Sequence, residues 1–317
     1  MLRQASPHSW TGEYAVEAVD LVKDFAEKRA VDGVSLSVPT GSIFGMLGPN
    51  GAGKTTTLRM LLGIIEPSSG ERRVLGCSRP IEAAHLIGYL PEERGLYKQM
   101  PVRRLLTYYG ELKGAPRKDV QRETDAWLSR LGLSGVADKK IQALSQGMSQ
   151  KVQFIATVVA RPELVILDEP FSGLDPVNRD VLRDAVLELK RRGTTIVFST
   201  HDMTMAELMC DRIFMIFKGR KVLDGSLDEI QSTYGRDEVH VRVQGGGDVL
   251  REIEGVRGVV DHGNAQQVRL SVDPQTFLAR LVARTTVQRF EITRPSLHDI
   301  FVEIARPAPE EDTTPAV

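Results

Sequence analysis

The sequence predicts an α/β fold built on a parallel sheet, followed by a smaller α+β domain. A glycine loop, 48–55, stands between an apolar run at 42–47 and apolar residues at helical spacing over 56–62. The runs 163–169 and 194–201 are typical of buried strands, and each ends in polar side chains. Because ligands of α/β sheets bind at the carboxyl ends of the strands, we expect a ligand site at that edge.

Composition describes a globular chain of 317 residues, with 41% hydrophobic and 26% charged residues. The formal net charge is −1, which gives no electrostatic reason to expect nucleic acid as a partner. The two cysteines, Cys77 and Cys210, have no paired spacing, which argues against a disulfide framework and against a zinc site.

No apolar run approaches the roughly 18–20 residues that span a bilayer, and residues 1–20 lack the apolar core of a signal peptide. We therefore expect a protein that is made and kept in the cytoplasm. If it works at a membrane, a partner must hold it there.

The first domain is expected over residues 13–235. Alternating apolar residues predict an edge-type strand near 14–22 and a second strand near 30–38. Helical periodicity without strand-like runs then predicts a helical insertion at about 100–160. Its basic residues could form a partner surface or simply a solvated face.

Composition changes around Gly235, and a second domain is expected over 236–305. Its predicted elements follow in the order βαββαβ, which is the ferredoxin-like arrangement. The strands are expected at 239–244, 256–262, 267–272 and 287–293, and the helices at 248–254 and 274–285. A last helix begins at Ser296, and residues 306–317, rich in Pro, Glu and Thr, are expected to be disordered.

The glycine loop has the pattern G-x-x-x-x-G-K-[ST] of a phosphate-binding loop, and its context is the one the motif requires. Backbone N–H groups would surround the phosphates, and the helix N-terminus would add partial positive charge. The alternative is an ordinary glycine-rich turn. The nucleotide-binding residues expected here are Gly48, Pro49, Asn50, Gly51, Ala52, Gly53, Lys54, Thr55 and Thr56. Lys54 would reach the β- and γ-phosphates, and the Thr55 hydroxyl would ligate Mg²⁺.

Further candidate residues lie at the ends of the predicted strands. Asp168 and Glu169 end one buried strand, and His201 ends another, although a lone histidine is more often a satisfied core residue. Phe25 precedes the phosphate loop and could stack on an adenine ring or fill the core of a small sheet. Asp175 is expected as the N-cap of a helix that starts at Pro176.

Taken together, residues 13–230 resemble the ATP-binding subunits of ABC transporters. Residues 48–55 are similar to the Walker A loop and 164–169 to Walker B, while 144–148 resemble the signature sequence. Residues 172–175 match the D-loop, and His201 the switch histidine.

The resemblance implies a role for each matching residue. Asp168 would hold Mg²⁺, Glu169 would be the general base, and His201 and Lys54 would act on the γ-phosphate. Phe25 would stack on adenine, and Asp175 would lie in the D-loop. The signature residues Ser145, Gln146 and Gly147 would contact the γ-phosphate held by a second subunit.

The chain departs from the family pattern at two places. Glu92 stands where most members have the Q-loop glutamine, and a carboxylate there could still ligate Mg²⁺. Gln146 and Met148 replace the usual Gly and Gln of the signature, whereas Ser145 and Gly147 are kept. These features and the small C-terminal domain resemble the branch that serves ABC-2-type exporters, such as sodium-extrusion and antibiotic-export systems.

The resemblance implies an ATPase that uses ATP and Mg²⁺ and energises an export permease from the cytoplasmic face of the membrane. The permease would be a separate polytopic subunit. Two copies, or one copy and a close homologue, would meet head to tail around ATP. The alternative is a soluble ABC-type ATPase that acts on nucleic acid or ribosomes. Such proteins usually show a long coiled coil, zinc cysteines or two cassettes in one chain, and this sequence has none of these.

Overall fold

The computed structural model describes residues 10–93, 95–234, 238–263 and 265–305. The chain divides into two compact units, one ending at Ser226 and the other beginning at Leu227. The expected tail, 306–317, and the expected domain boundary at 235–236 lie outside the described residues. The helix α7 (Leu227–Tyr234) groups with the second unit, although the sequence placed it in the first domain.

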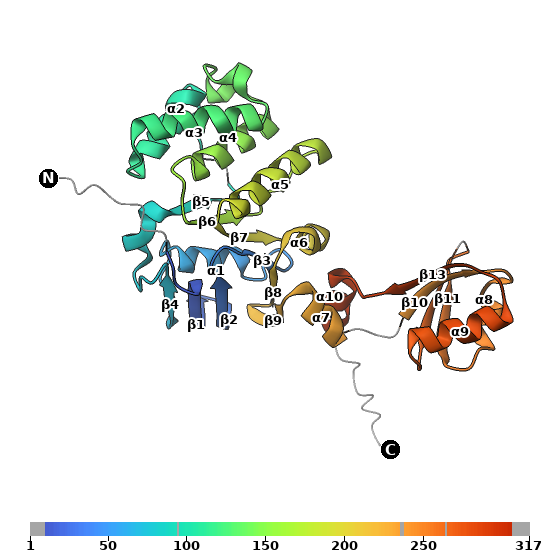
Figure 1. Cartoon of the computed structure of the whole chain (residues 1–317). Helices are drawn as coiled ribbons and strands as arrows, with labels where there is room; N and C mark the ends of the chain where they lie inside the picture. Colours follow the sequence, from blue (N-terminus) through green and yellow to red (C-terminus); the bar gives the residue numbers. More distant parts are fainter. Residues whose placement is uncertain (1–9, 94, 235–237, 264, 306–317) are drawn as a thin grey trace. The chain divides into compact units, whose positions relative to one another are not determined.

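A six-stranded sheet forms the centre of the first unit (Figure 1). The first five strands are parallel and the last one is antiparallel. In spatial order they are β5 (Ile87–Leu90), β6 (Leu164–Asp168), β7 (Thr195–Thr200), β3 (Ile43–Leu47), β8 (Arg212–Phe217) and β9 (Arg220–Gly225). The predicted parallel α/β sheet is therefore confirmed.

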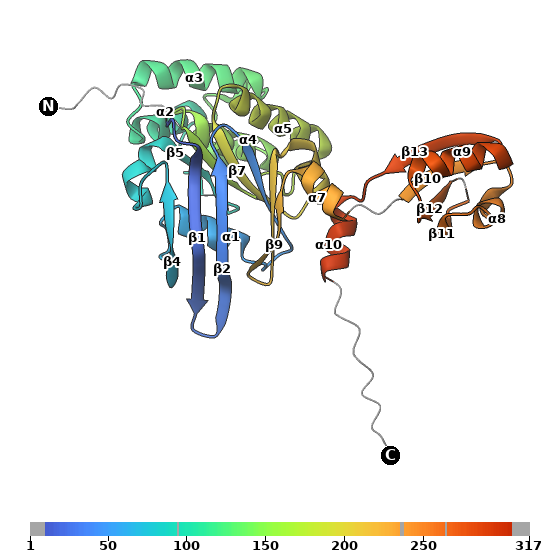
Figure 2. The same cartoon turned by 60° about the horizontal axis from the view of Figure 1, so that its bottom comes forward.

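A smaller antiparallel sheet joins β2 (Lys28–Pro39), β1 (Tyr14–Phe25) and β4 (Ser69–Val74), which lie side by side in Figure 2. The expectation of an edge-type strand at 14–22 is wrong, because β1 pairs on both sides, with β2 and with β4. Alternation showed that one face of this strand is buried, but it carries no information on how many neighbours the backbone pairs with.

Helices cover the six-stranded sheet, and the expected helical insertion is present (Figure 1). Its main helices are α2 (Val102–Leu112), α3 (Arg117–Arg130) and α4 (Gln146–Val158). The other helices of this unit are α1 (Lys54–Leu61), α5 (Pro176–Arg191) and α6 (Met203–Met209). Short 3₁₀ helices occupy Pro80–Leu86, Ser134–Val136 and Ile141–Ala143.

The strand β6 contributes side chains to two hydrophobic cores, one on each face of the sheet. Leu164 and Ile166 face a core shared with α1 and the antiparallel sheet, while Val165 and Leu167 face a core shared with the insertion and α5. All four side chains are fully buried. This double burial fixes the strand end that carries the carboxylates, since a shift by one residue would exchange its two faces.

The second unit has a four-stranded antiparallel sheet in the order β11-β12-β10-β13. With its helices it gives the chain order βαββαβ, as predicted for a ferredoxin-like domain. Its elements are β10 (Glu238–Val243), α8 (Gly246–Arg251), β11 (Val256–Asp261), β12 (Gln266–Leu270), α9 (Pro274–Arg284), β13 (Val287–Thr293) and α10 (Leu297–Ala305). Ser296 and Asp299 exchange hydrogen bonds at the start of α10, as a capping box requires.

Candidate nucleotide site

The phosphate loop connects the buried strand β3 to α1, and glycine is required at two of its positions. Gly48 has φ 151°, and a Cβ there would lie 2.2 Å from the Ile216 carbonyl oxygen. Gly53 has φ 112°, and a Cβ there would lie 2.7 Å from the Ala30 carbonyl oxygen. The loop can therefore curl closely against β8 and β2 only without side chains at these points.

Lys54 is the first residue of α1, and its side chain is 6% exposed. Its ammonium group donates to the carbonyl oxygens of Gly48, at 2.7 Å, and Pro49, at 3.2 Å. Nζ also lies 3.2 Å from Oε1 of Glu169. A compact cation thus sits inside the loop where incoming phosphate oxygens would replace these partners.

Asp168, at the end of β6, is held by two hydroxyl groups. Ser199 Oγ donates to Asp168 Oδ1 over 2.5 Å, and Thr55 Oγ1 donates to the same oxygen over 3.1 Å. The other oxygen, Oδ2, is buried and has no hydrogen-bond partner among the described residues. An orphaned buried carboxylate oxygen beside a hydroxyl suits a hard cation, which prefers oxygen ligands.

Glu169 follows Asp168 in a left-handed conformation, with φ 48°. Its N–H donates to Ser199 Oγ over 3.0 Å, and its side chain is 7% exposed. One carboxylate oxygen faces Lys54, and the other lies 3.1 Å from Nδ1 of His201. The structure therefore brings together the three residues predicted to be catalytic.

Glu92 comes from the loop after β5 and lines a cavity of about 180 Å³ with Asp168 and Glu169. Gln150 and Gln153, from α4, line the same cavity. Gln150 is 7% exposed, and its amide donates to the Pro170 carbonyl oxygen over 2.6 Å. The helix that follows the signature residues thus supports the turn that follows Glu169.

Within the described ranges, no group of three or more His, Cys, Asp or Glu side chains could hold a metal ion alone. This agrees with the way proteins bind Mg²⁺, by one or two carboxylates together with substrate phosphates. Thr55 and Asp168 fit such a site, since their oxygens already lie side by side.

Phe25 is the last residue of β1 and is 50% exposed, with Lys23 Nζ 5.3 Å from its ring centroid. The cavity of about 310 Å³ beside the phosphate loop is lined instead by Phe217 and Lys28, among others. Phe25 is exposed as a stacking residue must be, but it is not part of the lining of this cavity.

The signature residues lie at the start of α4, where Ser145 is the N-cap and its Oγ accepts from Met148 N over 3.3 Å. A Cβ on Gly147 would lie 3.3 Å from Asn178 Nδ2. Asp175 caps α5 as predicted, and the N–H of Asn178 lowers the pKa of its carboxyl. Within the described part of the chain, no hydrogen bond joins Ser145 or Gly147 to the phosphate loop.

The sequence analysis missed Ser199, Gln150, Gln153 and Phe217. Ser199 carries a recognisable signal, because it is a polar residue near the end of a predicted buried strand that neighbours β6. The two glutamines and Phe217 carry none, since their roles depend on how α4 and β8 pack beside the site.

Comparison with known proteins agrees with this geometry. Residues 31–172 match the family model described as ABC transporter, and residues 225–305 match the C-terminal domain of DrrA1-3-like ATP-binding proteins. The ABC transporter ATP-binding protein YhaQ of Bacillus subtilis (strain 168) is 41% identical, over 89% of this chain and 96% of YhaQ. The chain belongs to the ABC transporter ATP-binding proteins.

Other members of the family are similar along nearly their whole length. The Nod factor export ATP-binding protein I of Burkholderia lata is 33% identical over 89% of this chain and 94% of its own. A solved structure of an ATP-binding subunit of an ABC transporter has 29% identity and a TM-score of 0.66, and covers 70% of this chain and 93% of its own.

Membership of the family establishes the activity of this ABC protein. It binds ATP and hydrolyses it to power a membrane transporter, as the motifs predicted. Nothing in the comparisons supports the alternative of a soluble ATPase acting on nucleic acid or ribosomes. Among the residues that the structure describes, no helix is both long and apolar enough to cross a membrane.

Proposed function

We propose that this protein energises an ABC-2-type exporter from the cytoplasmic face of the membrane, as a dimer of cassettes bound to a separate permease. The observation that carries the proposal is the convergence of Lys54, Glu169 and His201 at one sheet edge, where the Glu169 carboxylate lies 3.2 Å from Lys54 Nζ and 3.1 Å from His201 Nδ1. The export role is supported by the printed name of the Nod factor export relative and by the match of the C-terminal domain.

The residues of the site divide the chemistry between them. Lys54 and the backbone N–H groups of the phosphate loop stabilise negative charge as the γ-phosphoryl group is transferred. Glu169 accepts a proton from the attacking water. Its Oε1 makes no hydrogen bond within the described residues and lies 3.2 Å from the Lys54 ammonium group. His201 is 55% exposed, so it can contact a γ-phosphate while it orients Glu169.

Mg²⁺ would be held by Thr55 and Asp168 together with phosphate oxygens, with Glu92 at the rim of the neighbouring cavity. When bound, it would neutralise phosphate charge and orient the nucleotide. Ser199 keeps the Asp168 carboxylate in place for this role.

The proposed dimer rests on the separation of the signature residues from the phosphate loop within one chain. Ser145 and Gly147 stand at an exposed helix N-terminus without a hydrogen bond to the phosphate loop of their own chain, among the described residues. A helix N-terminus is well suited to bind phosphate. Two copies related by a two-fold axis would place each signature against the other copy's phosphate loop, so that two identical subunits make two complete sites.

The permease surface is proposed near the loop that carries Glu92. Tyr97, Tyr108 and Tyr109 form a cluster with ring centroids 5.6–6.4 Å apart, and Tyr97 is 53% exposed. Exposed aromatic residues are typical of interface centres. Glu92 would link this surface to the nucleotide site. Arg94, which lies in the same loop and was expected to belong to this surface, is outside the described residues.

Co-expression with a tagged ABC-2-type permease tests the proposal. We expect the chain to co-purify with the permease in detergent and the ATPase rate of the complex to change when a transported substrate is added. A Tyr97→Asp, Tyr108→Asp double variant should lose co-purification and keep nucleotide binding. Retention of the complex by this variant, or recovery of the chain only with soluble partners, would contradict the proposal.

A further inference from the structure

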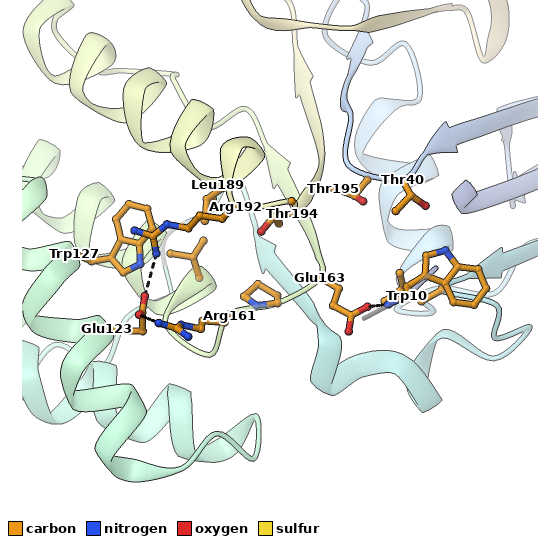
Figure 3. A pocket seen from close by; sticks show the side chains of 14 residues that line it. Trp10, Thr40, Glu123, Trp127, Arg161, Glu163, Leu189, Arg192, Thr194 and Thr195 are labelled. Carbon is orange, nitrogen blue, oxygen red and sulfur yellow. Dashed lines mark hydrogen bonds and ion pairs between the residues drawn. The ribbon is translucent and has the colours of Figure 1, made fainter. Parts of the chain in front are cut away.

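A cavity of about 680 Å³ lies in the first unit at the sheet edge opposite the nucleotide site (Figure 3). Glu163 and Thr194 directly precede β6 and β7, and both line it. The nucleotide site is formed by residues at the other ends of the same strands. The two sites therefore use different ends of the sheet and share no lining residue.

The cavity has the size and walls of a small-molecule site. Ligand pockets typically enclose about 300–1,000 Å³ and combine apolar and aromatic walls with a few polar groups. One wall comes from α3 of the helical insertion, and the others from the ends of α4 and α5 and from the start of the chain. The chain has two tryptophans, Trp10 and Trp127, and both line this cavity.

A charge cluster centred on the buried Glu123 occupies one end, where Figure 3 shows Glu123 between Arg161 and Arg192. The Glu123 side chain is 5% exposed. Arg161 pairs with one of its oxygens, and Arg192 Nη1 lies 3.3 Å from the other. Arg192 Nε also lies 3.0 Å from Glu188, and Arg130 and Arg191 pair with that same carboxylate. Four guanidinium groups thus share two carboxylates, which leaves an excess of positive charge and N–H donors near this end.

Trp127 lies at the same end and offers a donor that the protein does not use. Its side chain is 1% exposed, and its indole N–H is buried without a hydrogen-bond partner within the described ranges. The Arg192 guanidinium lies 5.1 Å from its ring centroid. An unused buried N–H is costly unless an acceptor completes it, so this end of the cavity lacks an acceptor group.

At the other end, the Trp10 N–H donates to Glu163 Oε2 over 2.6 Å, which anchors the Trp10 backbone at the rim. The apolar side chains of Leu75, Val158 and Leu189 complete the lining. The cavity therefore offers an apolar surface with donors and positive charge at one end.

We propose that this cavity is a second ligand site, for a flat amphipathic anion with an apolar ring system and a carboxylate, sulfonate or phosphate group. The acidic group takes the Trp127 N–H and the free donors of Arg161 and Arg192. The ring system lies against the apolar wall toward Trp10. The site is separate from ATP, and the proposal does not depend on the identity of the transported substrate.

The aromatic sulfonate 8-anilinonaphthalene-1-sulfonate is a suitable probe, titrated into the full chain with saturating Mg-ADP present to fill the nucleotide site. Because both tryptophans line the cavity, saturable binding should quench their emission and transfer energy to the probe. Arg161→Gln should weaken binding about tenfold, and Trp127→Phe, which removes the N–H, about three- to tenfold.

Arg183→Gln is the matched control, since Arg183 pairs with Asp180 and Asp184 on α5 and does not line the cavity. It should bind the probe like the unchanged chain. The Arg161 side chain is 59% exposed, so Arg161→Gln tests the proposal even if Trp127→Phe folds poorly. Equal affinities for the unchanged chain and Arg161→Gln would overturn the proposal, as would the absence of saturable probe binding while Mg-ADP fills the nucleotide site.

Discussion

Lys54 Nζ lies 3.2 Å from Glu169 Oε1, and both side chains are buried inside the nucleotide site. The cation that serves the phosphates therefore also neutralises the carboxylate proposed as the base. When phosphate oxygens draw Lys54 away, Glu169 becomes free to act on water. Glu169 would then act as a base only once nucleotide is bound. Until then, its ion pair with Lys54 avoids a buried unpaired carboxylate.

Glu169→Gln should still bind ATP and lose turnover by about 10²–10⁴-fold, because a general base is removed while the phosphate contacts remain. Phosphate release and fluorescent-nucleotide binding measure the two properties separately. Asp180→Asn, on the exposed surface of α5, is the control and should keep full activity. Turnover within a few-fold of the unchanged chain would remove Glu169 from the role of base.

His201→Ala should lower turnover by about 10²–10³-fold with little change in ATP affinity, because one contact to the transferred group and the partner of Glu169 Oε2 are both lost. The same two assays apply. A variant that loses ATP binding and turnover in equal measure would show that His201 supports the site structurally.

Glu92→Ala should weaken transport-coupled hydrolysis more than ATP binding, because Glu92 lines the cavity beside the carboxylates and also lies in the loop next to the proposed permease surface. Hydrolysis is measured with and without the permease. Glu92→Gln, which restores the residue usual in the family, should keep the coupling. Equal losses in both assays for Glu92→Ala would indicate a purely local metal role.

Mg-ATP should convert Glu169→Gln monomers into dimers, which sedimentation or light scattering can follow. Adding Ser145→Arg should abolish the dimer and spare nucleotide binding, since bulk and charge would occupy the proposed contact with the second phosphate loop. Ser134→Arg makes the same exchange on an exposed turn of the insertion and should leave the dimer intact. Dimerisation of the Ser145→Arg double variant with unchanged affinity for ATP would contradict the head-to-tail model.

Asp273→Ala should destabilise the second unit by about 1 kcal/mol, because Asp273 caps α9 and accepts from the Thr276 N–H over 2.9 Å. Chemical unfolding of the full chain, with ATPase activity as a parallel readout, measures the effect. Asp248→Ala is the control, since its side chain is 93% exposed and, among the described residues, its ion pair is with the neighbouring Arg251. A loss of ATPase activity before the second unit unfolds would show that the two units are coupled.

Much of the fold and the site could be predicted because the deciding signals are local in the sequence. The glycine loop, the carboxylates after 164–167 and the polar end of 194–201 each lie at a strand end, and a parallel sheet brings such ends to one edge. The βαββαβ order could also be predicted from alternation and helical spacing. These signals place residues on elements and elements in order.

The remaining features depend on contacts between distant segments. Whether β1 is central or at an edge depends on its pairing with β4, which the residues of β1 do not encode. The grouping of α7 with the second unit follows from contacts such as Gln231 Nε2 with the Pro295 carbonyl oxygen. The supporting role of Gln150 likewise appears only once α4 lies against the turn after Glu169.

The double burial of β6 limits how far the protein can be shortened. Its Val165 and Leu167 side chains are covered by the helical insertion and α5, while Leu164 and Ile166 are covered from the opposite face. A chain cut down by removing residues 100–160 would expose to water the part of this apolar face that the insertion covers, because α5 alone would remain on it. Such a minimal cassette should aggregate on expression, so the smallest soluble form of this ATPase must retain the insertion.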